Sequence, residues 1–132
     1  RSIYYFIIFV MYNFKSNLMG DRQTYFTLRG KSKKDYEFSC YYPEDILPIR
    51  DCVYILIIKT TYLHLPDTGM DVVFCGEVDS SSLNSISKTY MYDNKIYNVL
   101  YIGVLEEPSH DERVKIINDI IQNNKDIKHS LE

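Results

Sequence analysis

Apolar and β-branched residues occur in short runs along the chain, separated by polar turn segments. In residues 24–29, Phe26 and Leu28 alternate with Tyr25 and Thr27, which is the period-two pattern of a strand with one buried face. In residues 51–61 both alternating sets are apolar, and this favours a central strand buried on both faces. We predict seven strands, over residues 3–12, 24–29, 36–42, 51–61, 71–75, 88–92 and 96–104.

The segments between these runs have the composition of turns and loops. Asp93 and Asn94 tolerate the positive φ of a tight hairpin turn, so the strands on either side of them should pair antiparallel. Residues 30–35 predict a longer, solvated hairpin loop, and residues 66–69 a type I or II turn. Residues 79–87 are rich in serine and predict an exposed loop.

The C-terminal segment predicts a helix over residues 109–124. Ser109 and Glu112 have the spacing of a capping box, in which each side chain accepts a hydrogen bond from the other residue's backbone N–H. Asn123 and Asn124 are suitable helix stops. The apolar residues in between form one wide stripe at helical spacing, made of Val114, Ile116, Ile117, Ile120 and Ile121. This stripe should pack on the sheet.

Composition supports a mostly β protein. The chain of 132 residues has 13 tyrosines and 16 isoleucines but neither alanine nor tryptophan, so it is rich in strand formers and lacks the best helix former. Its length suits one domain over residues 1–132. We expect a small antiparallel β-barrel or a curled sheet, OB-like, with one C-terminal helix. Because the chain starts with Arg1 rather than Met, we expect a fragment of a larger protein.

The most apolar run is too short for a membrane span. Residues 3–10 are eight apolar residues, whereas a span needs roughly 18–20 residues. They could be a buried first strand or the remainder of a truncated membrane segment, and the β-branched and aromatic content favours the strand. We therefore expect no membrane span in this chain.

The cysteines argue against a disulfide framework and against a metal site. Cys40, Cys52 and Cys75 are odd in number, lack CxxC spacing and do not cluster with histidines. We expect three buried free thiols in a reducing compartment, the cytoplasm or nucleus. No metal and no other cofactor is expected.

No catalytic motif is present. The sequence has no nucleophile elbow, phosphate loop, dinucleotide fingerprint or H-E-x-x-H motif. His110, Asp111 and Glu112 lie where acidic side chains stabilise a helix start, and His64 between two leucines favours a strand position. We expect no catalytic residues and a protein that is not an enzyme.

Charge is distributed unevenly. Residues 1–34 hold seven basic and one acidic residue, whereas residues 35–132 hold eight basic and seventeen acidic residues. Basic side chains beside aromatic rings can hold phosphates and stacked bases of single-stranded nucleic acid. The candidate contact residues are therefore Arg22, Arg29, Lys31, Lys33 and Lys34, with Tyr25 and Tyr36 as stacking surfaces.

Two other interpretations of these features remain open. A lysine-rich hairpin can be no more than a solvated loop, or it can protect a sheet edge from aggregation. The many tyrosines could instead form a docking surface for a protein partner, because tyrosine is enriched at interfaces.

One stretch resembles a known family. The sequence F-T-L-R-G at 26–30, a basic loop, F-S-C-Y-Y at 38–42 and I-L-P-I-R-D-C-V-Y-I at 46–55 resemble the OB-like N-terminal barrel of RecD-type helicases of some large DNA viruses. Arg50 stands where that family has glycine. The resemblance covers about thirty residues. It implies a non-catalytic, nucleic-acid-binding module of a viral replication or helicase protein whose motor lies outside this chain.

Overall fold

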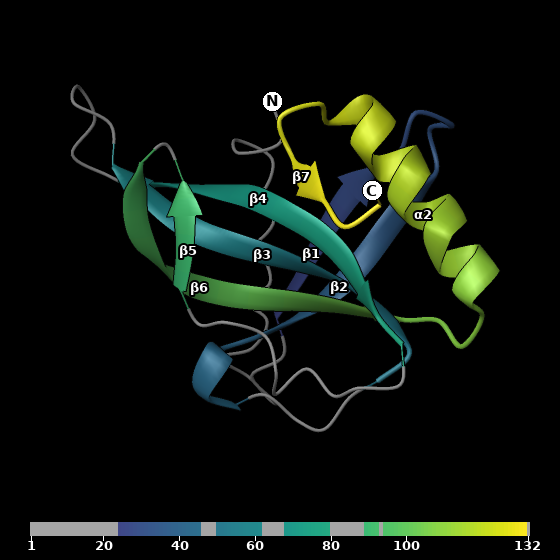
Figure 1. The fold of residues 1–132 in the computed structure, drawn as a ribbon, viewed down its shortest axis with the longest axis horizontal. Coiled ribbons are helices and arrows are strands. Elements are labelled where there is room, and N and C mark those ends of the chain that lie inside the picture. The colour runs from purple at the N-terminus through teal and green to yellow at the C-terminus, as the bar shows by residue number, and fades with distance from the viewer. Residues whose placement is uncertain (1–23, 46–49, 62–67, 80–88, 93, 132) are drawn as a thin grey trace.

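The computed structural model describes residues 24–45, 50–61, 68–79, 89–92 and 94–131 (Figure 1). Their elements are, in chain order, β1 (Thr24–Arg29), β2 (Asp35–Tyr41), the 3-10 turn η1 (Pro43–Asp45), β3 (Cys52–Thr61), β4 (Thr68–Val78), β5 (Thr89–Tyr92), β6 (Lys95–Glu106), α2 (His110–Asn123) and β7 (Lys128–His129). In this part of the chain no helix is long and apolar enough to cross a membrane.

The described strands form one open sheet. Their order is β1-β2-β6-β3-β4-β7, and β5 pairs with β6 beside this path. Every pairing is antiparallel except the parallel pairing of β4 with β7. The predicted fold class, a mostly β chain with a curled sheet and one C-terminal helix, is confirmed. Of the two architectures expected, these strands adopt the curled sheet and not the closed barrel.

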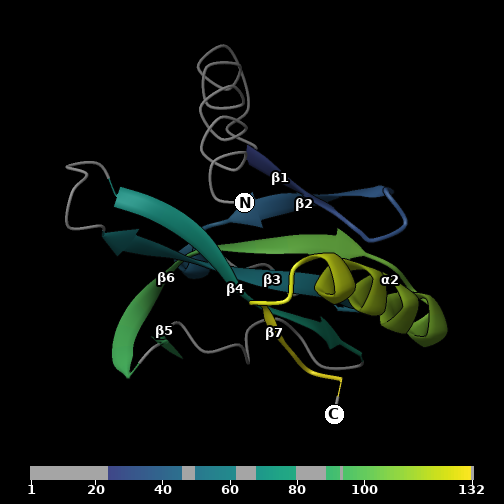
Figure 2. The same ribbon diagram turned by 90° about the horizontal axis from the view of Figure 1, so that it is seen from above.

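The curl of the sheet follows β6. The first part of β6 pairs with β5, and its later residues pair with β2 on one side and β3 on the other. Figures 1 and 2 both show the β5 hairpin at the end of the sheet far from α2. Gly103 lies where β6 crosses the core, and a Cβ there would be 2.6 Å from Ile55 Cγ1. Glycine at 103 therefore permits the close packing of β6 against β3.

β3 is central and buried on both faces, as predicted. One face of the sheet carries a core that α2 covers, formed by Phe26, Leu28, Tyr36, Phe38, Cys40, Val53, Ile55, Ile57, Val72, Cys75, Ile117, Ile120 and Ile127. The other face carries a second cluster, formed by Cys52, Tyr54, Leu56, Ile58, Val73, Val78, Val99, Ile102 and Val104. All three cysteines are buried and free, which confirms the predicted burial of the thiols.

Helix α2 begins and ends where the sequence predicts. The Ser109 side chain accepts a hydrogen bond from the Glu112 N–H at 3.3 Å, and Asn124 is the C-cap. The second half of the expected capping box is wrong. The Ser109 N–H donates to the Glu107 carboxylate at 3.1 Å, and the Glu112 carboxylate contacts Lys115 instead. Glu107 takes the place of Glu112 because it lies two residues before Ser109, where its carboxylate reaches the Ser109 N–H.

The remaining strand predictions differ mainly in length. β4 runs from Thr68 to Val78, longer at both ends than residues 71–75, because it pairs along the whole of β3. The short β7 was not predicted. In the β5–β6 hairpin Asn94 has a φ of 64°, as its turn position predicts. The predicted strand at 3–12, His64, residues 66–67 of the predicted turn and residues 80–87 of the predicted loop lie outside the described residues. Thr68 and Gly69, predicted as part of that turn, instead begin β4.

Candidate functional site: the basic hairpin

The hairpin between β1 and β2 carries most of the predicted site residues, and residues 29–35 are called the basic hairpin below. Arg29 and Asp35 form its last strand pair. The Gly30 N–H donates to the Lys34 carbonyl at 2.9 Å, and the Lys33 N–H donates to the Gly30 carbonyl at 3.0 Å. Lys33 has a φ of 72°, the left-handed conformation that closes hairpin loops of this kind. The loop is therefore a compact turn with a defined backbone.

The basic hairpin is fastened to α2 by Asp119, and we call this set of contacts the Asp119 clasp. The carboxylate accepts the Ser32 N–H at 2.9 Å, the Ser32 hydroxyl, and the Tyr36 hydroxyl at 2.7 Å. The Asp119 carbonyl also accepts the Lys31 N–H at 3.0 Å. The hydrogen bond from the Ser32 hydroxyl lowers the pKa of Asp119 below its ordinary value, so the carboxylate is charged at neutral pH. The predicted hairpin loop is exposed at residues 31–35, as expected, and it is also docked on α2.

Gly30 provides the room for this clasp. A Cβ at position 30 would lie 2.1 Å from Asp119 Oδ2 and 2.4 Å from its Cγ. A side chain there would force the Asp119 carboxylate out of its place. Two further contacts support the junction, because the side-chain amides of Asn123 and Asn124 donate to the Arg29 carbonyl at 2.9 and 3.2 Å.

Arg29 is engaged by a neighbouring carboxylate. Its Nε lies 2.8 Å from Asp35 Oδ1 and its Nη2 3.3 Å from Oδ2. The hydrogen bond from Arg29 lowers the pKa of Asp35, so this pair is fully charged at neutral pH. The charge of Arg29 is therefore largely offset before any ligand binds.

Tyr36 does not offer the exposed ring that was expected. Its side chain is only 8% exposed, because Tyr36, Phe38 and Cys40 share the strand face that packs under α2. Burial, followed by the hydrogen bond to Asp119, raises the pKa of Tyr36 to about 12. The Lys34 ammonium lies 5.5 Å from the ring centroid. The prediction of Tyr36 as a stacking surface is wrong, and the residue instead belongs to the Asp119 clasp.

The other predicted residues divide into three groups. Lys31, Lys33 and Lys34 are exposed on the turn. Tyr25 is half-buried on the opposite sheet face, beyond the strand pair of Thr27 and Glu37. Arg22 lies outside the described residues. The structure thus brings the three lysines together on the turn, with Tyr25 on the other sheet face and the Tyr36 ring buried beside Lys34.

The local charge at the turn is positive. Residues 29–35 hold four basic residues and one acidic residue, which gives +3, and Asp119 reduces this to +2. The surrounding chain is acidic overall, with a net charge of −3 for all 132 residues. An anionic ligand would therefore be attracted to the turn, although the net charge of the whole chain opposes its approach.

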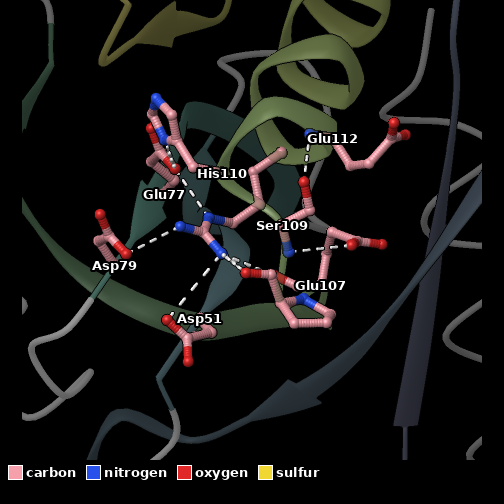
Figure 3. A network of polar contacts seen from close by, with 9 residues as sticks. Asp51, Glu77, Asp79, Glu107, Ser109, His110 and Glu112 are labelled. Carbon is pink, nitrogen blue, oxygen red and sulfur yellow. Dashed lines mark hydrogen bonds and ion pairs between the residues drawn. The ribbon is translucent and has the colours of Figure 1, made fainter.

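A second polar network, at the other end of α2, was not predicted. Arg113 is fully buried and lies within this network. Its Nε donates to Glu77 at 2.7 Å, its Nη2 donates to Asp79 at 3.0 Å, and its Nη1 donates to the carbonyls of Glu107 and Pro108. Figure 3 shows Glu77, Asp79 and Asp51 arranged around the start of the helix. This network connects α2 to the ends of β3, β4 and β6.

His110 and Asp51 both contact members of this network. His110 Nδ1 lies 3.0 Å from Glu77 Oε1, at the first residue of the helix, where the sequence placed it. Asp51 Oδ1 lies 4.0 Å from Arg113 Nη1. The Asp51 N–H donates to the Asp79 carbonyl, and the Asp51 carbonyl accepts the Glu107 N–H. The sequence signal for Arg113 was its spacing, because positions 113, 117 and 120 share one helix face.

The expected tyrosine-rich docking surface is small. Among the tyrosines whose side chains the structure describes, Tyr42 alone is exposed, and it stacks on Tyr101 with ring centroids 5.2 Å apart. The exposed apolar pair lies elsewhere. Met91 and Ile96 face each other across the β5–β6 hairpin and are 65% and 70% exposed.

Within the described residues, no group of three or more His, Cys, Asp or Glu side chains is arranged to hold a metal ion. Comparisons of the chain with models of protein families, with curated proteins and with solved structures find no match.

Proposed function

We propose that the chain is a non-catalytic binding module that contacts the phosphates of single-stranded DNA or RNA through Lys31, Lys33 and Lys34. The observation that carries this proposal is that three exposed lysines lie on one compact turn, whose backbone is fixed by the Asp119 clasp. Lysine contacts phosphate as a flexible point charge, so the three side chains need no fixed geometry of their own once the backbone of the turn is in place.

The structure reduces the expected contact set. Arg29 is paired with Asp35, and Tyr36 is buried, so neither forms part of the proposed contact surface. Tyr25 is about 13 Å along the strand from Arg29, at roughly 3.3 Å per residue. A base could stack on Tyr25 only if the bound nucleic acid extended beyond the turn and across the sheet face. The proposed interface is therefore mainly electrostatic. In its larger context the module would belong to a replication or helicase protein, as the family resemblance implies.

The test is the salt dependence of oligonucleotide binding. Fluorescence anisotropy of a labelled oligothymidylate and of an oligouridylate, titrated at several salt concentrations, should give binding that falls roughly as the second power of salt, because about 0.7 counterion is released per single-strand contact. The K31Q/K33Q/K34Q variant should lose binding. Replacing Arg29 by Gln should leave the salt dependence unchanged, because Arg29 is already paired with Asp35.

A matched control removes the same charge elsewhere. The K59Q/K95Q/K115Q variant takes one exposed lysine each from β3, the start of β6 and α2, and it should bind like the unaltered protein. Absence of binding at low salt would refute the proposal. Equal loss of binding in the two triple variants would also refute it, because the loss would then follow from the change in net charge and not from the position of the lysines.

The second candidate function is docking of a protein partner, favoured by the exposed pair of Met91 and Ile96. The two large apolar side chains are strand neighbours, so they expose one contiguous apolar area, and such areas can mark a protein interaction site. A partner bound there should be lost in the M91S/I96S variant, should survive removal of the three lysines, and should be nearly insensitive to salt. The two candidate functions therefore predict opposite responses to the same two variants.

A further inference from the structure

We infer that Asp119 is a positioning residue for the proposed phosphate contact, which it serves by holding the basic hairpin in its binding conformation, although its own charge repels phosphate. This inference rests on the proposed function. The observation that carries it is the set of hydrogen bonds to Asp119, whose carboxylate accepts two from Ser32 and one from Tyr36.

The residues on both sides of Lys31 accommodate the Asp119 carboxylate. Gly30 leaves the space that the Asp119 side chain occupies, and the Lys31 N–H donates to the Asp119 carbonyl. Ser32, between the lysines, donates through both its backbone and its hydroxyl. The clasp thus fixes backbone atoms at residues 31 and 32, directly between the proposed contact residues.

Two effects of Asp119 on binding oppose each other. Its negative charge near the lysines weakens attraction to phosphate, but at a partly exposed site this effect is small and is screened by salt. Its hydrogen bonds remove the conformational freedom that the turn would otherwise lose on binding. Because the clasp orders a turn that carries three lysines, we expect the second effect to exceed the first.

Gly30→Ala separates these effects, because it alters no charge. The added Cβ would displace the Asp119 carboxylate, and the position has no positive φ that would strain alanine. We expect affinity for the labelled oligothymidylate to fall about tenfold at fixed salt, the size expected from loss of preorganisation at a few side chains. Asp119→Asn should also weaken binding, although the loss of a negative charge alone would strengthen it.

The charge-matched control is Asp111→Asn. Asp111 is exposed on the same helix, eight residues before Asp119 and about 12 Å away at roughly 1.5 Å per residue. This variant should bind as tightly as the unaltered protein or slightly more tightly. Hydrogen exchange at the Lys31 and Ser32 amides reports on the clasp independently of binding, and both amides should exchange faster in the Gly30→Ala and Asp119→Asn variants.

The outcomes separate the inference from the function on which it rests. If the unaltered protein does not bind oligonucleotides, the proposed function fails and the inference falls with it. If the unaltered protein binds and both clasp variants bind equally well or more tightly, the inference alone is overturned, whether or not the amides exchange faster. If Gly30→Ala does not fold, Asp119→Asn and Ser32→Ala decide in the same way.

Discussion

Replacing Arg113 by Met should destabilise the protein strongly. Arg113 is fully buried, and its guanidinium donates to two carboxylates and two carbonyls. Methionine has a suitable apolar shape but donates no hydrogen bond, so Glu77 would be left partly buried without its main partner. Of the two carboxylates, Glu77 is 16% exposed but Asp79 is 71% exposed, so only the pair with Glu77 is buried. Removing one partner of a buried ion pair costs about 3–5 kcal/mol, and we expect a loss near the lower end, still a large part of the roughly 5–15 kcal/mol that stabilises a domain. For a chain of this size the melting temperature should fall by about 10 °C.

Urea denaturation followed by far-ultraviolet circular dichroism measures this loss. Lys115→Met is the matched control, because it also replaces a basic residue by methionine on the same helix, but at an exposed ion pair with Glu112. This control should change the free energy of unfolding by less than about 1 kcal/mol. A loss below about 1 kcal/mol in the Arg113→Met variant would show that the network contributes little and that α2 is held by its apolar face alone.

Four further predictions concern single groups. Ser109→Ala should cost about 1 kcal/mol of unfolding free energy in the same urea assay, because the Glu112 N–H loses its cap; an unchanged midpoint would contradict the cap. Lys33→Gly should stabilise the protein by about 0.5 kcal/mol, because glycine adopts the observed φ of 72° without steric cost; a lower urea midpoint would contradict this. Burial by itself raises the pKa of Glu77, but hydrogen bonds from Arg113 and His110 lower it below 4.5. The unaltered protein should therefore be more stable than the Glu77→Gln variant at about pH 7, and this difference should shrink as the pH falls through the lowered pKa. A difference independent of pH in urea titrations would refute this. Burial raises the pKa of Cys40 and Cys75 to about 12 and the pKa of Cys52 to about 11. A thiol reagent at about pH 8 should therefore react slowly with the native protein, and three thiols should titrate after unfolding. Finding one thiol would reveal a disulfide.

The elements that the sequence predicted well are those set by local patterns. Strand β1 matches residues 24–29 because its period-two alternation is flanked by clear turn residues. The ends of α2 follow from Ser109 and Asn124, which cap the helix through short-range hydrogen bonds. Tyr36 could also have been placed correctly, because residues 36, 38 and 40 alternate with Glu37 and Ser39. This alternation indicates the core for the Tyr36 ring, and it outweighs the aromatic character that favoured base stacking.

The features that were missed depend on contacts between distant segments. Asp119 has the pattern of an ordinary exposed helix position, and its partner Ser32 lies 87 residues earlier in the sequence. The short β7 forms only because the chain after α2 returns alongside β4. Nothing local specifies either contact. The candidate site was therefore predicted as a set of charges, and the structure shows which of those charges are already paired.

The two polar contacts of α2 differ in burial, and this difference separates stability from binding. Arg113 is fully buried at the start of the helix, where loss of its partners leaves charged groups without compensation. Asp119 lies six residues further along the helix, and its hydrogen bonds to Ser32 are exposed, so their loss should cost less stability than loss of the Arg113 contacts. The Asp119 clasp can therefore set the conformation of the basic hairpin while contributing less to the stability of the sheet than the Arg113 network does. A turn that contributes little to the core is free to carry exposed lysines, which is why the proposed contact surface lies at the Asp119 end of the helix.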